Sequence, residues 1–134
     1  MDPDIESVQH SSQIIGSENC FHGSLCSIPY TERFDLITFN KVLEHVKDPI
    51  VLLKQAIPLL EKSSYVYIEL PEGQRSFVDG TFAARSEFFI EHFTIFNAQS
   101  IKYLAQKAGF SVLKSETYDD PSGKRSIFAF LTKT

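Results

Sequence analysis

The side chains best suited to chemistry gather between Asn40 and His45, in the segment NKVLEH that follows a short apolar run. The imidazole of His45 could take a proton from a nucleophile or orient a substrate. The structural alternative is a histidine that hydrogen-bonds across a strand–helix turn, and the sequence leaves both open. Glu44 precedes a helix and is expected to be a solvated acid favoured by the helix dipole.

A second candidate pair is Glu91-His92, which lies in a segment rich in phenylalanine. With His92 as a second catalytic candidate, the aromatic side chains could shape a substrate pocket. Alternatively, they form the core beneath a loop, and His92 is a polar neighbour with its hydrogen bonds satisfied. The phenylalanines concerned are Phe88, Phe89, Phe93 and Phe96.

Cys20, His22 and Cys26 are three potential metal ligands in one short segment. There is no fourth ligand beside them and no second C-x-x-C pair, so no metal site is expected. Two cysteines do not make a disulfide framework either, and a reducing, cytoplasmic location is the default expectation.

The elements that must position these residues can be derived from the sequence pattern. The run Asp35 to Asn40 predicts a strand buried on both faces, as in a parallel sheet. Asp48-Pro49 opens a helix, because Asp48 can cap free N–H groups and proline suits the first helical position. A buried strand, a polar turn and a helix form half of a βαβ unit. Asn40 to His45 would then lie at the carboxyl end of the strand, where open α/β sheets bind ligands.

The remaining pattern predicts an α/β sheet layered by helices, with an antiparallel hairpin at its C-terminal end. A helix capped by Asp4 should end at Gly16, Pro58 should disturb the end of the helix from Pro49, and Asn97 should cap a helix that ends at Gly109. Residues 72–91 form a long connection. The expected strands are Cys20–Phe21, Asp35–Asn40, Tyr65–Leu70, Val112–Tyr118 and Ser126–Thr132, with a possible short helix at Phe82–Phe89.

Size and charge limit the function. The 134 residues suffice for one domain, taken as residues 1–134. A net charge of −4 argues against nucleic acids and anionic membranes as partners. No apolar run approaches the roughly 18 residues that span a bilayer. The polar start of the chain is unlike a secretory signal.

Three segments together are similar to a known family: FDLITFNKVLEHVKDPIVLLKQ, YVYIELPEG and EHFTIFNAQSIKYLAQKAGF. Their order resembles the C-terminal two-thirds of class I S-adenosylmethionine-dependent methyltransferases, in a subgroup that acts on small molecules. The resemblance implies a Rossmann-like methyltransferase sheet, S-adenosylmethionine as cofactor and a small-molecule substrate.

The resemblance also implies roles for individual positions. Asp2 falls where the family holds the cofactor ribose, and Ser24 and Leu25 fall at the adenine, with Ser24 in place of the usual acid. The turn that carries His45 would line the methionine end of the cofactor and the substrate, through Asn40, Lys41 and Val42. Pro71 to Gly73 and the stretch around His92 would face the substrate.

The sequence departs from the family in lacking the glycine-rich turn D/E-x-G-x-G-x-G, and Lys62-Ser63-Ser64 replaces Pro-Gly-Gly. The fold is therefore expected to be N-terminally truncated, with weak cofactor binding. The alternatives are an inactive remnant that folds and self-associates, or an unrelated α/β interaction domain. The family's first strand would lie beside Asp35 to Asn40, so that strand should have an open edge, and a homodimer through this edge is expected.

Overall fold

The computed structural model describes residues 1–29, 31–78, 91–121 and 124–134. The chain forms two compact units, Met1–Glu32 and Arg33–Thr134. The single-domain assignment of residues 1–134 stays a prediction, and each unit is described by itself.

The first unit contains the predicted helix, α1 (Ile5–Ile15). Its N-terminus is capped as expected, because the Asp4 carboxylate accepts a hydrogen bond of 2.9 Å from the Ser7 N–H. Gly16 ends the helix at φ 89°, a conformation that side chains disfavour. Two short 3₁₀ helices follow, η1 (Ser17–Asn19) and η2 (Leu25–Ser27). The very short strand predicted at Cys20 and Phe21, with His22 as an optional third residue, is not formed. In the described part of this unit, strand pairing is limited to one isolated bridge between Asp2 and His22.

The second unit contains a four-stranded sheet in the order β1-β2-β4-β3. Its strands are β1 (Phe34–Asn40), β2 (Leu60–Pro71), β3 (Phe110–Asp119) and β4 (Arg125–Lys133). β1 and β2 are parallel, whereas β4 is antiparallel to both β2 and β3. The α/β class and the C-terminal hairpin are thus confirmed. β2 begins earlier than predicted, and the Ser64 hydroxyl near its start donates to the Phe34 carbonyl at 2.6 Å.

β1 is not the strand buried on both faces that its apolar sequence predicts. Among the described strands it pairs only with β2, so it lies at the edge of the sheet. Phe39 is buried, but Leu36 is 49% exposed. Apolar residues alone do not distinguish a central strand from an edge strand, because that depends on pairing with distant segments.

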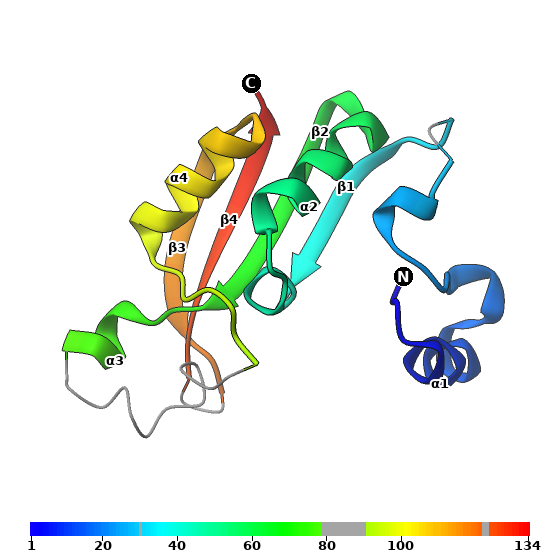
Figure 1. Cartoon of the computed structure of the whole chain (residues 1–134), viewed down its shortest axis with the longest axis horizontal. Helices are drawn as coiled ribbons and strands as arrows, with labels where there is room; N and C mark the ends of the chain where they lie inside the picture. The colour runs from blue at the N-terminus through cyan, green and yellow to red at the C-terminus, as the bar shows by residue number, and fades with distance from the viewer. Residues whose placement is uncertain (30, 79–90, 122–123) are drawn as a thin grey trace. The chain divides into compact units, whose positions relative to one another are not determined.

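Two helices lie side by side on one face of the sheet (Figure 1): α2 (Pro49–Ala56) and α4 (Ala98–Ala108). The predicted caps are present, since Asp48 accepts from the Val51 N–H and Asn97 from the Ser100 N–H. Pro58 ends α2 in a 3₁₀ turn, η4 (Ile57–Leu59). Between β2 and α4 lies the short helix α3 (Gln74–Val78), which the sequence analysis missed. The helix expected at 82–89 lies outside the described residues.

The helices cover the sheet through apolar side chains that are almost fully buried. At about 25 cal/mol per Å² of apolar surface, this layer supplies most of the driving force that holds the sheet together. No helix in the described ranges is long and apolar enough to cross a membrane. The buried residues include Leu53, Ala56 and Leu59 from the α2 region, Ile101, Leu104 and Ala108 from α4, and Val66, Ile68, Leu70, Ile127 and Leu131 from the strands.

Candidate functional site

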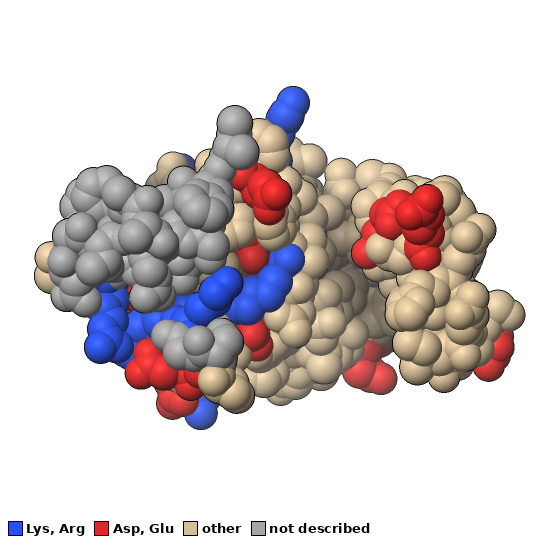
Figure 2. Space-filling model, turned by 90° about the horizontal axis from the view of Figure 1, so that it is seen from below, with Lys and Arg blue, Asp and Glu red and all other residues tan. Residues whose placement is uncertain are grey.

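A cavity of about 340 Å³ opens where the parallel strands β1 and β2 end. Figure 2 looks at this end of the sheet, and Lys and Arg side chains form a band there with Asp and Glu beside it. Such strand ends are where open α/β sheets bind ligands, and the volume is within the range of small-molecule sites. The cavity is lined by Lys41, Glu44, His45, Pro71, Glu91, His92, Asp120, Lys124, Arg125 and Ser126.

Lys41 leaves β1 in a left-handed conformation, with φ 54°. A non-glycine residue in this region is uncommon and has a conformational cost. Its N–H donates to the Glu69 carbonyl at 2.9 Å, and its ammonium donates to the Ser126 hydroxyl and lies 3.6 Å from Glu69 Oε1. These contacts hold the Lys41 side chain across the ends of β2 and β4.

Glu69 accepts hydrogen bonds from two tyrosine hydroxyls, Tyr67 at 2.6 Å and Tyr118 at 2.8 Å. Burial alone would raise the pKa of this carboxyl, but the two hydroxyls and Lys41 together lower the pKa below its ordinary value. The pKa of Tyr67 is raised strongly, first by burial and then by the Glu69 carboxylate. The end of β2 therefore carries an ionised, well-partnered carboxylate.

Glu44 lies in η3 (Leu43–His45), the short 3₁₀ turn after β1, and is 1% exposed. Its backbone carbonyl accepts from the Phe93 N–H at 2.8 Å, and its Oε2 atom is buried with no hydrogen-bond partner among the described residues. Burial raises the pKa of this carboxyl, and its own backbone N–H and the rings of His45 and His92 oppose that only in part. The expectation of a solvated acid is wrong, because the 3₁₀ turn directs the side chain inward instead of into a helix N-terminus.

His45 and His92 meet beside this carboxylate. Their ring centroids are 4.7 Å apart at an interplanar angle of 68°. His45 Nδ1 lies 3.0 Å from the Glu91 carbonyl, and Nε2 lies 3.9 Å from Glu44 Oε1. A carbonyl only accepts, so Nδ1 carries the proton, and in the neutral ring the lone pair is on Nε2.

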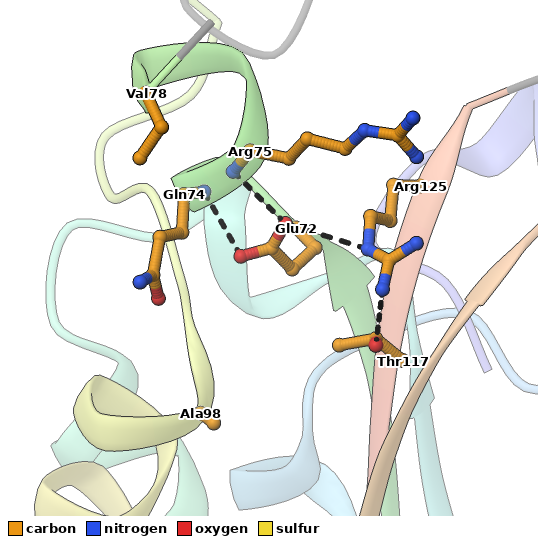
Figure 3. Close-up of a pocket in the computed structure, with 7 residues that line it drawn as sticks. All are labelled: Glu72, Gln74, Arg75, Val78, Ala98, Thr117 and Arg125. Atoms are coloured by element: carbon orange, nitrogen blue, oxygen red, sulfur yellow. Dashed lines mark hydrogen bonds and ion pairs between the residues drawn. The ribbon is translucent and has the colours of Figure 1, made fainter.

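A second cavity, of about 450 Å³, is built around Glu72 and is lined by residues of α3, α4, β3 and β4 (Figure 3). Glu72 is 5% exposed and accepts from the N–H groups of Gln74 at 2.9 Å and Arg75 at 3.3 Å. Its Oε2 is 3.9 Å from Arg125 Nε, and Arg125 Nη2 donates to the Thr117 hydroxyl at 2.8 Å. The carboxylate in this cavity is thus fully partnered.

Of the predicted catalytic and turn residues, the structure brings Lys41, His45 and His92 together around the first cavity. Asn40 and Val42 belong to the same turn and are exposed, but they do not line it. In the predicted aromatic pocket, Phe96 is a core residue and Phe93 is 58% exposed, whereas Phe88 and Phe89 lie outside the described residues.

The predicted ribose and adenine residues lie in the first unit. The Asp2 carboxylate accepts from the Asp4 N–H at 2.8 Å, Ser24 forms a capping box with Ser27, and Leu25 is buried. Among the described residues, Cys20, His22 and Cys26 do not form a ligand cluster; the three-residue cluster is Glu44, His45 and His92.

Sequence reasoning missed the contribution of the hairpin to the first cavity. Asp120, Lys124, Arg125 and Ser126 line it because β4 pairs with β2, which places the start of β4 beside Pro71. No local pattern in these residues signals a site. The only indirect signal was the prediction that a terminal hairpin joins the sheet.

A comparison with protein families identifies the fold. Residues 2–115 match the family described as a methyltransferase domain. The chain belongs to this family. An unrelated interaction domain would be favoured if Asn40 to His45 were buried and no cavity opened at the strand ends, but a cavity opens beside these residues. A search of the curated proteins found no match to this methyltransferase domain.

Solved structures resemble the domain at low identity. LepI in complex with SAM is 13% identical with a TM-score of 0.73, over 99% of this chain and 35% of LepI. The magnesium protoporphyrin IX methyltransferase of Synechocystis PCC 6803, with bound SAH, is 10% identical with a TM-score of 0.63. The match covers 96% of this chain and 58% of that protein. An O-methyltransferase from neocarzinostatin biosynthesis, in complex with S-adenosyl-L-homocysteine and 1,4-dihydroxy-2-naphthoic acid, is 13% identical with a TM-score of 0.65. The match covers 96% of this chain and 39% of that protein. These likenesses show the Rossmann-like methyltransferase fold, and the chain spans about a third of the length of the first structures it matches.

Proposed function

We propose that this chain contributes the substrate-facing part of an S-adenosylmethionine-dependent methyltransferase that acts on a small molecule. The observation that carries the proposal is the cavity at the carboxyl ends of β1 and β2, where Lys41, His45 and His92 converge. The family match supports methyl transfer as the chemistry, and several structures of the same fold contain SAM or SAH.

The residues present fit the methionine end of the cofactor better than its nucleoside. The Lys41 ammonium and the polar cavity offer partners for an amino-acid group, whereas the 134 residues contain no glycine-rich turn that would let the backbone approach closely. In this proposal Asn40, Lys41 and Val42 flank the methionine end of the cofactor. The roles of Asp2 at the ribose and of Ser24 and Leu25 at the adenine stay predictions from the family resemblance. When bound, the cofactor supplies an activated methyl group.

His45 and His92 are proposed to contact the methyl acceptor. The Glu91 carbonyl fixes the proton on His45 Nδ1, so the Nε2 lone pair is available to accept a proton from an acceptor hydroxyl or amine. The geometry of the cavity would hold the acceptor in place, and positioning is a large part of the barrier reduction in such transfers.

Cofactor binding tests the proposal. Because the backbone contacts of a glycine-rich turn are worth about 1 kcal/mol each, we expect S-adenosylmethionine to bind the isolated chain with a dissociation constant above about 100 µM. Ligand-observed NMR should detect this weak binding, and S-adenosylhomocysteine should compete. A low-micromolar constant by calorimetry would show that the turn is dispensable. No detectable binding would favour the inactive, self-associating alternative.

Self-association through β1 is the second part of the proposal. β1 pairs only with β2 among the described strands, and Phe34 and Leu36 are 37% and 49% exposed. An apolar strand edge is a template for pairing, and a second copy of the same strand satisfies it about a two-fold axis.

Light scattering at micromolar concentration should therefore report a dimer. Leu36→Lys places a charge on the edge and should produce a monomer, whereas Val51→Lys, at a 48% exposed position of α2, should leave the dimer intact. A wild-type chain that is a stable monomer would contradict this part of the proposal.

A further inference from the structure

One feature of the first cavity is not explained by a substrate contact alone. Among the described residues, Glu44 Oε2 has no hydrogen-bond partner, and Glu44 is only 1% exposed. A buried polar atom without a partner costs about 1–3 kcal/mol, and more when the group is charged. Native proteins contain few buried polar atoms without a partner, and one explanation for such an atom is an ion that binds at the site.

The surroundings of Glu44 narrow that explanation. His45 Nε2, which carries the lone pair of the neutral ring, is 3.9 Å from Glu44 Oε1. Two electron-pair donors that face each other repel, and a positive species such as a metal ion between them would relieve that repulsion. One ligand atom each from Glu44, His45 and His92 lies within 4.8 Å of the others. Ligand atoms lie roughly 2.0–2.2 Å from a Zn²⁺ ion, so the three side chains would have to close around the ion.

The hydrogen bonds around Glu44, His45 and His92 resemble those that surround the ligands of a metal site. A histidine that binds a metal usually donates its other ring N–H to a carbonyl or carboxylate, which fixes the ring and its tautomer. His45 does so to the Glu91 carbonyl at 3.0 Å. The Phe93 N–H donates to the Glu44 carbonyl at 2.8 Å, which ties the chain after His92 to the turn that holds the other two residues.

We propose that Glu44, His45 and His92 form a binding site for a divalent transition-metal ion such as Zn²⁺. Two imidazoles and one carboxylate suit Zn²⁺, Co²⁺ and related ions, and three protein ligands leave a position open toward the cavity. With the His45 Nε2 lone pair on the ion, the ion would replace His45 in promoting loss of the acceptor proton, because it would lower the pKa of an acceptor oxygen bound there. Metal binding can be measured without cofactor or substrate, so the inference stands or falls independently of the proposed methyl transfer.

The experiment is a titration of the wild-type chain with Zn²⁺ in competition with a chromophoric chelator, together with Co²⁺ absorption spectra. We expect binding of one ion and a Co²⁺ spectrum without the near-ultraviolet band that thiolate ligands give. Glu44→Gln and His92→Ala should each weaken Zn²⁺ binding about 100-fold or more, since even outer contacts of such sites are worth 10–100-fold.

Matched variants separate the site from general effects. Glu91→Gln removes an acidic charge from the same cavity, and His10→Ala removes an exposed histidine of α1. Each should change the Zn²⁺ affinity by less than about fivefold, as screened surface charges do. Replacing Cys20 and Cys26 by serine should leave the affinity unchanged.

Thermal melting supplies a readout that a purely structural role would not move. Zn²⁺ should raise the melting temperature of the wild type and of Glu91→Gln, but not of Glu44→Gln, because a ligand stabilises only the state that binds it. The inference would be overturned by absence of Zn²⁺ and Co²⁺ binding. It would equally be overturned by binding that Glu44→Gln leaves intact or by a thiolate spectrum.

Discussion

Glu44 and Glu72 are two buried glutamates that follow neighbouring parallel strands, and they are held in opposite ways. Glu72 follows β2 and is surrounded by donors: two backbone N–H groups and the Arg125 guanidinium (Figure 3). Glu44 follows β1 and has one carboxylate oxygen without a partner among the described residues. The difference indicates that Glu72 stabilises the fold, whereas Glu44 is kept at a cost in stability, as functional residues often are.

The largest effect in this comparison is expected for Glu72→Gln. The glutamine amide keeps the shape of the side chain but has no charge. Its NH₂ group is a donor, so it cannot accept a hydrogen bond from the N–H groups that surround this position. We expect the free energy of unfolding to fall by about 2–3 kcal/mol, because a buried network loses one partner. Urea denaturation measures this change.

The control for that measurement is Glu116→Gln, which removes the partner of Lys114 in a surface ion pair with both side chains more than half exposed. It should change the free energy of unfolding by less than about 0.5 kcal/mol. If Glu72→Gln lowered the free energy of unfolding no more than Glu116→Gln does, the polar network of the second cavity would not hold α3 and β4 together.

A smaller effect of the opposite sign is expected for Glu44→Gln without metal present. Removing a buried charge that lacks a partner should leave the free energy of unfolding unchanged or raise it by about 1 kcal/mol. The same urea experiment applies. If Glu44→Gln instead destabilised the domain as much as Glu72→Gln, the two glutamates would have the same structural role and the contrast between the cavities would be lost.

The sequence was sufficient to predict several helix ends and the hairpin, but not the contrast between Glu44 and Glu72. The caps at Asp4, Asp48 and Asn97, the stop at Gly109 and the effect of Pro58 were all predicted correctly, because each follows from local backbone chemistry. The hairpin was also predicted correctly, since alternation and a turn rich in Asp, Pro and Gly specify it.

What the sequence could not supply was the environment of single side chains. A glutamate before a helix is ordinarily solvated, and nothing local reveals that η3 turns Glu44 inward. The edge position of β1 and the arrival of Ser126 beside Lys41 depend on pairing between segments far apart in sequence. Such pairing decides which polar atoms are satisfied, and short-range patterns do not contain it.

The smallest effect concerns a third carboxylate, Glu69, whose partners are uncharged hydroxyls as well as Lys41. Because its pKa is lowered in the folded protein, Glu69 contributes stability above its ordinary pKa of 4.5, and that contribution is lost as the pH falls through the folded value. The raised pKa of Tyr67 acts at alkaline pH. The stability that Tyr67 contributes is present below its ordinary pKa of 10.0 and is lost as the pH rises toward the folded value. Urea midpoints between pH 3 and pH 7 should therefore converge for wild type and Glu69→Gln as the pH falls, with the wild type the more stable near pH 7. Parallel curves would show that Glu69 is no better partnered than Glu44, which would remove the distinction between a stabilising carboxylate and one held for binding.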